Sequence, residues 1–316
     1  MRIRGSTIAV TGGCGFIGSH LVEALLAAGA AEVRVIDNLG SGAEENLDAV
    51  RADPRLRLSA ADLRAADALE AVSGCHAVVH LAAVKHGPSR EDPERLWSTN
   101  LEASYRLFRR AVEAGVERLV FASSLYVYGT ERPGPFGEDD PLLAATLYGA
   151  TKVSAEAMLR AVTAGSATRS TVLRYFFVYG PRLYRGGYAS SLVPRSLRRI
   201  LGGRPPEVFG DGRQVFDYIY IDDAIDATLA AIEHPDPGRV YNVCTGEGVA
   251  VLDVVETLLS LTGSELRPVF GPADETDGTV RTGRPERMIE ELGVVPRVAL
   301  AAGLRRSIDW WRAGSY

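Results

Sequence analysis

The feature that most constrains the fold is a glycine-rich turn that directly follows an apolar run near the N-terminus. The run Thr7–Val10 has the length and composition of a buried strand, and Gly12, Gly15 and Gly18 follow it at intervals of three residues. Glycine tolerates positive φ and close backbone approach, because it has no Cβ. A strand, a tight glycine turn and a helix in that order favour a site where the helix N-terminus binds phosphate.

Short apolar runs alternate with longer amphipathic stretches through the first half of the 316 residues. The predicted strands are Thr7–Val10, Val33–Ile36, Leu56–Ser59, Ala77–Leu81, Arg118–Ala122 and Thr171–Arg174. The predicted helices are Gly18–Ala28, Ala65–Val72, Pro93–Ala114 and Leu147–Ala164. Apolar strands separated by helices indicate a parallel sheet covered on both faces. With right-handed crossovers, this pattern predicts an α/β fold with a doubly wound parallel sheet of the Rossmann type.

The pattern changes after Tyr175, where glycine and proline pairs interrupt the chain. A cationic helix is predicted at Leu192–Leu201, a strand at Asp217–Ile221 and a helix at Asp222–Ile232. We expect residues 1–174 to form a dinucleotide-binding Rossmann domain, to which the chain returns at about 213–245. Residues 175–212 and 246–316 then form a smaller C-terminal substrate-binding cap.

Composition argues against several classes of function. The net charge of −5 gives no reason to expect a nucleic acid partner. No stretch approaches the roughly 18 apolar residues of a membrane span, and the N-terminus does not resemble a signal peptide. Three widely spaced cysteines, Cys14, Cys75 and Cys244, predict neither a disulfide framework nor a metal site. We therefore expect a cytoplasmic protein with no membrane or metal partner.

Asp37 ends the second predicted strand, about twenty residues after the glycine turn. A carboxylate at this point can accept hydrogen bonds from both hydroxyls of an adenosine ribose, and it repels a 2′-phosphate. Asn38 and Leu39 follow it, and neither offers the cation that a 2′-phosphate requires. The predicted cofactor is therefore NAD rather than NADP.

Tyr148 and Lys152 are four residues apart at the start of a predicted helix, so both side chains project from one face. A free phenol titrates near pH ~10, and a nearby ammonium lowers that pKa toward the range of a general base. Ser124 follows the fifth predicted strand, at the end where such sheets bind ligands, and its hydroxyl can hold the reacting oxygen. A Tyr-x-x-x-Lys spacing also arises by chance, and a serine can simply cap a strand. We predict that Ser124, Tyr148 and Lys152 form a catalytic trio.

These motifs together resemble the extended short-chain dehydrogenases/reductases, and within them the NAD-dependent epimerase/dehydratase family. The resemblance spans residues 6 to about 245, and its further motifs are Asp62-Leu63, His80–Ala83, Val127–Gly129, Leu173–Phe176 and Val178–Arg182. It implies that Asp62 and Leu63 contact the adenine, and that Ala82, Ala83 and Lys85 line the nicotinamide side. The full set of implied cofactor contacts is Gly12, Gly15, Phe16, Ile17, Gly18, Asp37, Asn38, Asp62, Leu63, Leu81, Ala82, Ala83, Lys85, Asn100, Tyr148, Lys152 and Tyr175.

The residues after Ser124 bear on which reaction of this family the chain performs. Family members that eliminate water or decarboxylate a uronic sugar carry acidic residues just after this serine, whereas this chain has Leu125 and Tyr126. Because no general acid stands there, the resemblance favours reversible oxidation of a carbinol carbon. In the family, that chemistry usually serves C4 epimerisation, in which a keto intermediate turns over and receives the hydride on its other face.

Two aromatic residues depart from the family pattern. Phe177 stands where the family usually has an asparagine that contacts the diphosphate, and Phe216 stands where it usually has an arginine. A third expected arginine, near the turn 273–277, has no obvious counterpart. An aromatic ring cannot replace a charge-assisted bond to phosphate, so these departures suggest a more apolar pocket.

Several cations can compensate. Arg182, Arg185, Arg213 and Arg281 can form a rearranged diphosphate clamp, although each is more often an ordinary solvated arginine. His86 and Arg90 can touch substrate, although a solvated loop is the simpler interpretation. The implied substrate contacts are Lys85, Ser124, Tyr126, Phe177, Arg182 and Phe216.

The predicted function is NAD-dependent epimerisation of a sugar nucleotide at C4. The alternative, favoured by the two phenylalanines, is an NAD-dependent dehydrogenase or ketoreductase that acts on a non-nucleotide sugar, glycoside or polyol. A catalytically silent NAD-binding regulator is disfavoured, because the catalytic trio is intact. The resemblance also implies a homodimer that forms a four-helix bundle from Pro93–Ala114 and Leu147–Ala164.

Overall fold

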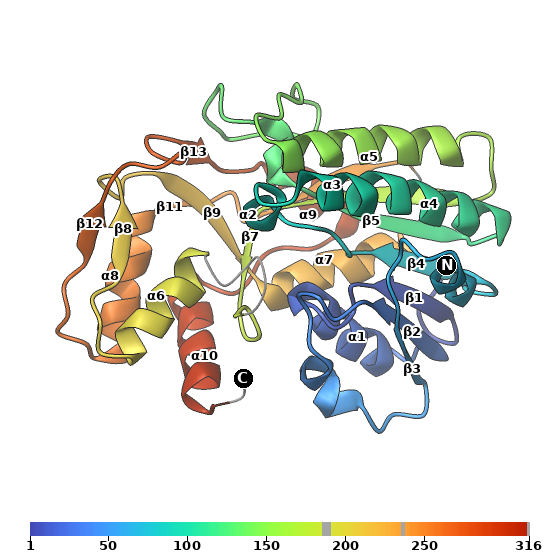
Figure 1. The fold of residues 1–316 in the computed structure, drawn as a ribbon, viewed down its shortest axis with the longest axis horizontal. Coiled ribbons are helices and arrows are strands. Elements are labelled where there is room, and N and C mark those ends of the chain that lie inside the picture. The colour runs from blue at the N-terminus through green and yellow to red at the C-terminus, as the bar shows by residue number, and fades with distance from the viewer. Residues whose placement is uncertain (185–190, 235–237, 315–316) are drawn as a thin grey trace.

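A seven-stranded sheet, in which every strand is parallel to its neighbours, forms the centre of the larger lobe (Figure 1). The structure is a computed structural model, and it describes residues 1–184, 191–234 and 238–314. The strand order is β10-β6-β5-β4-β1-β2-β3. The strands are β1 (Thr7–Thr11), β2 (Glu32–Asp37), β3 (Leu56–Ala60), β4 (Ala77–His80), β5 (Arg118–Ser124), β6 (Arg169–Tyr175) and β10 (Val240–Val243).

Helices cover both faces of this sheet. On one face, α1 (Phe16–Ala27) packs against α7 (Ile221–Glu233), and α4 (Ser104–Glu113) packs against α5 (Leu147–Thr163) on the other (Figure 1). The first strand lies between β2 and β4, so the chain winds outward in both directions from β1. This arrangement confirms the predicted doubly wound parallel sheet.

Two predicted helices differ in detail from the structure. The stretch expected as one helix at Pro93–Ala114 consists of α3 (Pro93–Trp97), a π-helical turn (Ser98–Ala103) and α4. A wide turn of this kind is typical of functional sites, and hydrophobic periodicity does not reveal it. The stretch expected at Ala65–Val72 is a 3-10 helix of Asp67–Val72, which buries Leu69 and Val72 at the three-residue spacing of that helix.

The remaining elements form a smaller lobe and the connecting turns. Strands β7 (Phe177–Tyr179), β9 (Val215–Tyr220), β11 (Gly248–Ala250) and β13 (Val280–Arg281) form one small sheet, and β8 (Glu207–Phe209) pairs with β12 (Val269–Gly271). The helices of this part are α6 (Leu192–Leu201), α8 (Val251–Thr262) and α10 (Leu300–Arg312), whereas α9 (Glu286–Leu292) packs against α7 and β10 of the larger lobe. The short elements elsewhere are α2 (His86–Ser89) and the 3-10 helices Glu44–Val50 and Leu125–Tyr128.

Strand pairing bears on the predicted return of the chain at about 213–245. The strand expected at Asp217–Ile221 is β9, and it belongs to the small sheet rather than to the central one. The return to the central sheet consists of α7 and β10. A mostly apolar run such as this one indicates a buried strand but does not say which sheet contains it. The predicted boundaries of the Rossmann domain and cap otherwise stay a prediction.

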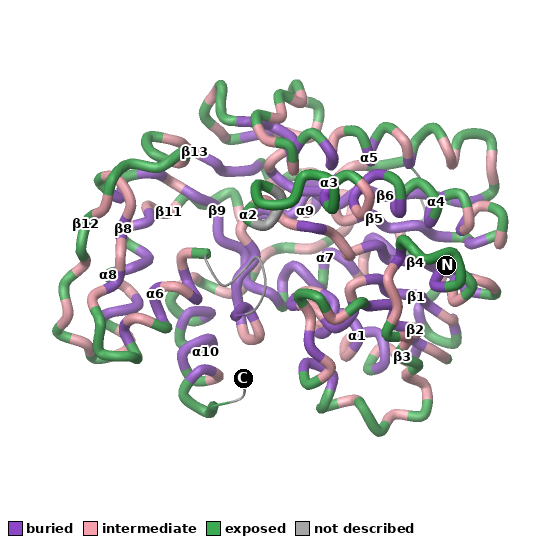
Figure 2. Tube along the Cα trace, in the orientation of Figure 1, coloured by how far each residue is buried: buried purple, intermediate pink, exposed green. Residues whose placement is uncertain are grey.

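The two lobes share one core. Buried residues follow the central strands and the inner sides of α6 and α10 (Figure 2). A single hydrophobic cluster joins Val10 and Leu25 of the central lobe to Leu197, Val254 and Ile308 of the smaller lobe. The cap is therefore built onto the sheet and does not have a separate core. None of the described helices is long and apolar enough to cross a membrane.

Candidate active site

A cavity of about 820 Å³ lies at the carboxyl ends of the central strands and extends to the cap. Gly12, Asp37, Leu81, Ser124 and Tyr175, each at or just after the end of a strand, line it, as expected for an open parallel sheet. The cavity brings together these predicted site residues: Gly12, Gly15, Phe16, Ile17, Gly18, Asp37, Asn38, Asp62, Leu63, Leu81, Ala82, Ala83, Lys85, Ser124, Tyr126, Tyr148, Lys152, Tyr175, Phe177, Arg182 and Phe216.

The glycine turn has the geometry of a phosphate cradle. Gly12 has φ +73°, and a Cβ there would lie 2.9 Å from the backbone nitrogen of Ala82. A Cβ on Gly18 would lie 2.1 Å from the carbonyl oxygen of Gly12. Gly15 precedes α1 without a side-chain cap, so the first N–H groups of the helix are left for a ligand. These residues fit the pyrophosphate of NAD.

Asp37 is positioned by backbone groups on both of its oxygens. Its carboxylate accepts hydrogen bonds from the backbone nitrogens of Cys14, at 2.9 Å, and Leu39, at 2.8 Å. Burial raises the pKa of this carboxyl, and the two hydrogen bonds oppose that shift. Nearby, Asn38 donates to Asp62 at 2.9 Å, and a side-chain hydrogen bond from Arg64 is the main cause of the lowered pKa of Asp62. This rim fits the adenosine end of NAD.

Asn100 is the predicted cofactor contact that does not line the cavity. Its amide oxygen accepts from the nitrogen of Val84 at 2.8 Å, and its amide nitrogen donates to the Val84 oxygen at 2.9 Å and to Thr151 at 3.3 Å. The π-helical turn directs the side chain toward this loop. The structure therefore gives Asn100 a positioning role: it fixes the segment that carries Lys85.

The predicted trio meets where β5 and α5 approach each other. Ser124 is the last residue of β5, and its hydroxyl forms a hydrogen bond with Tyr148 in the first turn of α5. Thr146 caps that helix by accepting from the nitrogen of Gly149 at 3.0 Å. Lys152 lies one turn further, and its Nζ donates to the carbonyl oxygen of Ala122 at 2.7 Å.

Burial controls the ionisation of the two residues on α5. It raises the pKa of Tyr148, and the hydrogen bond with Ser124 opposes this shift. It lowers the pKa of Lys152 to about 7, and the negative charge of Glu156 opposes that shift. We expected the ammonium to lower the pKa of Tyr148. In this state desolvation dominates, because the Lys152 nitrogen is turned to Ala122 and lies 5.8 Å from the centroid of the Tyr148 ring.

A buried ion pair lies behind the trio. Glu156, one turn after Lys152, accepts hydrogen bonds from Ser123 and from Arg174, whose Nη2 is 2.7 Å away. Arg174 also donates to the Tyr128 hydroxyl at 2.9 Å. Glu156 thereby links the end of β5, the helix α5 and strand β6. Our sequence analysis missed this residue, although its four-residue spacing from Lys152 could have revealed it.

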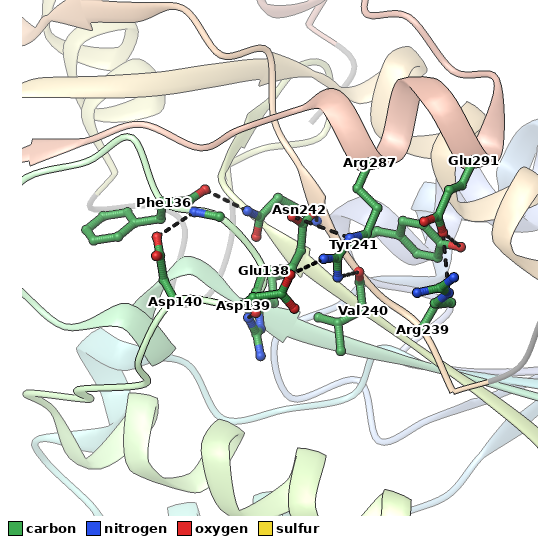
Figure 3. Close-up of polar contacts among 12 residues, drawn as sticks. Phe136, Glu138, Asp139, Asp140, Arg239, Val240, Tyr241, Asn242, Arg287 and Glu291 are labelled. Atoms are coloured by element: carbon green, nitrogen blue, oxygen red, sulfur yellow. Dashed lines mark hydrogen bonds and ion pairs between the residues drawn. The ribbon is translucent and has the colours of Figure 1, made fainter.

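This network continues away from the cavity, and Figure 3 shows its outer part. Asn242 of β10 accepts from the Tyr128 hydroxyl at 2.7 Å and donates to the carbonyl oxygen of Phe136 at 2.8 Å. Its backbone nitrogen donates to Glu138 at 2.8 Å, and Arg287 of α9 pairs with the neighbouring Asp139. These contacts tie the loop that follows β5 to β10 and α9.

Aromatic rings form the substrate end of the cavity. Phe177 and Phe216 stack with centroids 4.4 Å apart and planes 16° apart, and Tyr218 lies 5.7 Å from Phe177. Tyr126 meets the Tyr148 ring edge-on at 5.6 Å. The two phenylalanines that depart from the family pattern are therefore in contact with each other and lie on the wall of the predicted site.

Further cap residues that the sequence analysis missed also line the cavity, among them Arg195, Phe209, Gln214 and Tyr218. Their polar atoms Arg195 Nε, Gln214 Oε1 and Tyr218 Oη are buried without hydrogen-bond partners. A ligand that fills the cavity can satisfy such atoms. The run Gly210–Tyr218 contains two of them, but a motif match alone does not tell which of its side chains face a cavity.

The arginines proposed as compensating cations have different environments. Arg182 pairs with Glu23 of α1 at 2.5 Å, and the Arg213 side chain is 88% exposed. Arg185 lies outside the described residues. Arg281 is buried in β13, against aromatic rings.

The loop after the nicotinamide-side motif is less solvated than we expected. The His86 side chain is 17% exposed and pairs with Glu275 of the cap at 2.7 Å. Its ring contacts that of Tyr126, with centroids 4.9 Å apart and planes tilted by 33°. Arg90 pairs with the same carboxylate. These contacts join the cap to the central lobe beside the cavity.

The fold and the Tyr–Lys pair define a dinucleotide-dependent enzyme of the extended short-chain dehydrogenase/reductase class. The model of the NAD dependent epimerase/dehydratase family matches residues 8–244, and the chain belongs to that family. Family membership confirms the predicted resemblance and confirms NAD as the cofactor. The assignment of individual site residues stays a prediction.

Relatives and solved structures cover nearly the whole chain. The UDP-glucose 4-epimerase of Azospirillum brasilense is 33% identical, over 97% of this chain and 92% of its own length. The UDP-N-acetylglucosamine 4-epimerase of Methanobrevibacter ruminantium M1 superposes with a TM-score of 0.92 at 29% identity, over 98% and 99% of the two chains. A double mutant of the dTDP-glucose 4,6-dehydratase of Streptomyces venezuelae, solved with NAD bound, superposes with a TM-score of 0.90 at 31% identity, over 96% of each chain. The family thus includes both epimerases and dehydratases.

Proposed function

We propose that this enzyme epimerises a nucleotide sugar at C4, by transient oxidation to a keto sugar and return of the hydride to the other face. The similarity to 4-epimerases supports the nucleotide-sugar substrate and the C4 position. The redox step is supported by the lining of the cavity, which includes Ser124 and Tyr148 as well as the glycine turn.

The observation that carries the proposal is the absence of an acid directly after Ser124. Elimination of water requires a proton donor for the departing hydroxyl. Leu125 is 3% exposed and packs into a hydrophobic cluster with Val127 and Tyr128. Tyr126 is a poor proton donor for a departing hydroxyl, since burial raises its pKa above that of a free phenol and so makes it a weaker acid. The site is therefore equipped for hydride transfer without elimination.

Each member of the trio has a defined task in this reaction. Ser124 holds the sugar hydroxyl, and the Tyr148 oxygen accepts the hydroxyl proton as the carbon is oxidised, then returns it after the keto sugar has turned over. Bound NAD supplies a reversible hydride acceptor whose oxidised form carries a positive charge, which favours the phenolate of a nearby tyrosine. Lys152 is anchored on Ala122, where its charge can stabilise that phenolate.

The experiment that tests this proposal compares the NAD-loaded enzyme with Tyr148→Phe. With UDP-glucose or UDP-galactose as substrate, the wild type should interconvert the two sugars without accumulating NADH. Tyr148→Phe should keep NAD and the fold, and its chemical step should slow by a factor of order 10² to 10⁴. Near-normal turnover by the variant would contradict the role of Tyr148.

The stacked pair Phe177 and Phe216 favours a second candidate. An NAD-dependent dehydrogenase or ketoreductase that acts on a non-nucleotide sugar, glycoside or polyol would use an apolar wall where the family usually binds a diphosphate. Such an enzyme exchanges NAD freely and accumulates NADH in proportion to the substrate oxidised. An epimerase regenerates its NAD in every turnover, so this readout separates the two candidates.

We also propose that the protein is a cytoplasmic homodimer. Trp97, Tyr105 and Leu147, on the predicted bundle helices, are 63%, 40% and 58% exposed, and apolar side chains of this size favour a partner surface. The three cysteines form no disulfide, which supports a reducing compartment.

A further inference from the structure

Arg281 lies on the strand next to the unusual phenylalanine. Strand β13 pairs in parallel with β9, and Arg281 is the direct partner of Phe216 in that register. The resemblance to the family places a guanidinium at position 216, and this chain carries one on the adjacent strand instead.

The Arg281 side chain is buried without a counter-ion. It is 4% exposed, and its Cζ lies 5.5 Å from the centroid of the Tyr126 ring and 5.8 Å from that of Phe216. Among the described residues, no carboxylate forms an ion pair with it; a side-chain hydrogen bond joins it to Tyr126, and its Nε is buried without an acceptor. A buried cation requires an anion or a full set of hydrogen bonds, and ring faces replace these only in part.

The two rings that flank Arg281 belong to the cavity. Tyr126 and Phe216 both line it, and Tyr126 also touches Tyr148. Arg281 itself does not line the cavity, and its guanidinium lies directly behind these two rings. The guanidinium stands at the end of a long, flexible side chain, and side chains at binding sites commonly change rotamer when a ligand binds. A small rearrangement can therefore present Arg281 to a ligand.

We propose that Arg281 binds an anionic oxygen of the substrate and thereby replaces, from the neighbouring strand, the guanidinium that is missing at position 216. Two sources supply this chemistry: the diphosphate of a nucleotide sugar, and a carboxylate on the sugar itself. The inference rests on the proposed function, because it takes the substrate to be a nucleotide sugar. It also explains how an aromatic wall and an anionic substrate coexist in one cavity.

The test is a calorimetric titration of the NAD-loaded enzyme with uridine, UDP, UDP-glucose and UDP-glucuronic acid. Arg281→Met should weaken UDP binding tenfold or more and leave uridine binding unchanged if the anion is the diphosphate. A loss confined to UDP-glucuronic acid assigns the anion to the sugar carboxylate. Arg57→Met, which removes an arginine that is 66% exposed and does not line the cavity, is the matched control and should not change any affinity.

A second variant relocates the charge. Phe216→Arg combined with Arg281→Phe exchanges the two partners across the strand pair, and it should restore the UDP affinity that Arg281→Met loses. It also keeps the test valid if Arg281→Met does not fold, which NAD binding and thermal melting report. Unchanged binding of all four ligands by Arg281→Met would overturn the inference and leave the proposed function standing. A wild-type enzyme that binds neither UDP nor dTDP, titrated in the same way, would overturn both.

Discussion

Lys152 should destabilise the free protein, and its replacement by methionine should stabilise it. The side chain is 3% exposed, and burial lowers its pKa from 10.5 to about 7. A shift of that size lowers the free energy of unfolding by about 4 kcal/mol at pH 7. At this pH the lysine is fully protonated in the unfolded chain but only about half protonated in the folded protein. Loss of the hydrogen bond to Ala122 offsets about 1 kcal/mol of the gain.

The sign of the pH dependence follows from the direction of the shift. The pKa of Lys152 is lower in the folded protein, so the unfolded chain binds more protons between pH 7 and 10.5. The free energy of unfolding of the wild type should therefore rise in that window, and Lys152 should contribute up to about 1.4 kcal/mol per pH unit. Lys152→Met lacks this term, so its advantage should be largest at or below pH 7 and shrink steadily toward pH 10.

Urea unfolding of NAD-free wild type and Lys152→Met at pH 7, 8 and 9 measures this advantage. We expect Lys152→Met to be about 2–3 kcal/mol more stable than wild type at pH 7, and we expect this difference to be clearly smaller at pH 9. Lys85 and Lys152 are the only lysines in the chain, so ¹³C reductive methylation labels these two lysines and the N-terminus alone. NMR of the labelled protein gives the pKa of Lys152, and its signal is assigned by its loss in Lys152→Met. A variant less stable than wild type at pH 7, or an advantage that does not change with pH, would refute the reasoning.

Three further predictions test other parts of the site. NAD should bind at least tenfold tighter than NADP, a difference of about 1.4 kcal/mol, and calorimetry that finds equal affinities would remove the role of Asp37. Glu156→Gln should lower the pKa of Lys152 further and move the alkaline limb of the kcat profile to lower pH, whereas a merely structural residue would lower kcat equally at every pH. Trp97→Glu should convert a dimer to monomers in analytical ultracentrifugation, and an unchanged mass would place the interface elsewhere.

The cofactor half of the site could be predicted because its requirements are local. The turn admits only glycine at Gly12 and Gly18, which is a property of a short segment. The same is true of the carboxylate at the end of the second strand. The Tyr148–Lys152 pair is equally local, because one helical turn brings both residues to the same face. Such constraints appear in sequence as fixed spacings.

The rest of the site depends on contacts between segments far apart in the chain. Asn100 was predicted to contact the cofactor, yet it lies in the π-helical turn and its amide binds the backbone of Val84 instead. The relation of Arg281 to Phe216 exists only through the pairing of β13 with β9. No periodicity or spacing reveals which strand lies beside which, so the sequence left the position of the compensating cation open.

The central claim is that the hydride removed from C4 returns to the same carbon of the same sugar. UDP-glucose deuterated at C4, incubated with the NAD-loaded enzyme, tests it directly by NMR and mass spectrometry of the products. The account predicts UDP-galactose that retains the deuterium at C4, with no accumulation of NADH. Deuterium that accumulates in released NADH, with an oxidised sugar as product, would contradict it and identify the enzyme as a dehydrogenase.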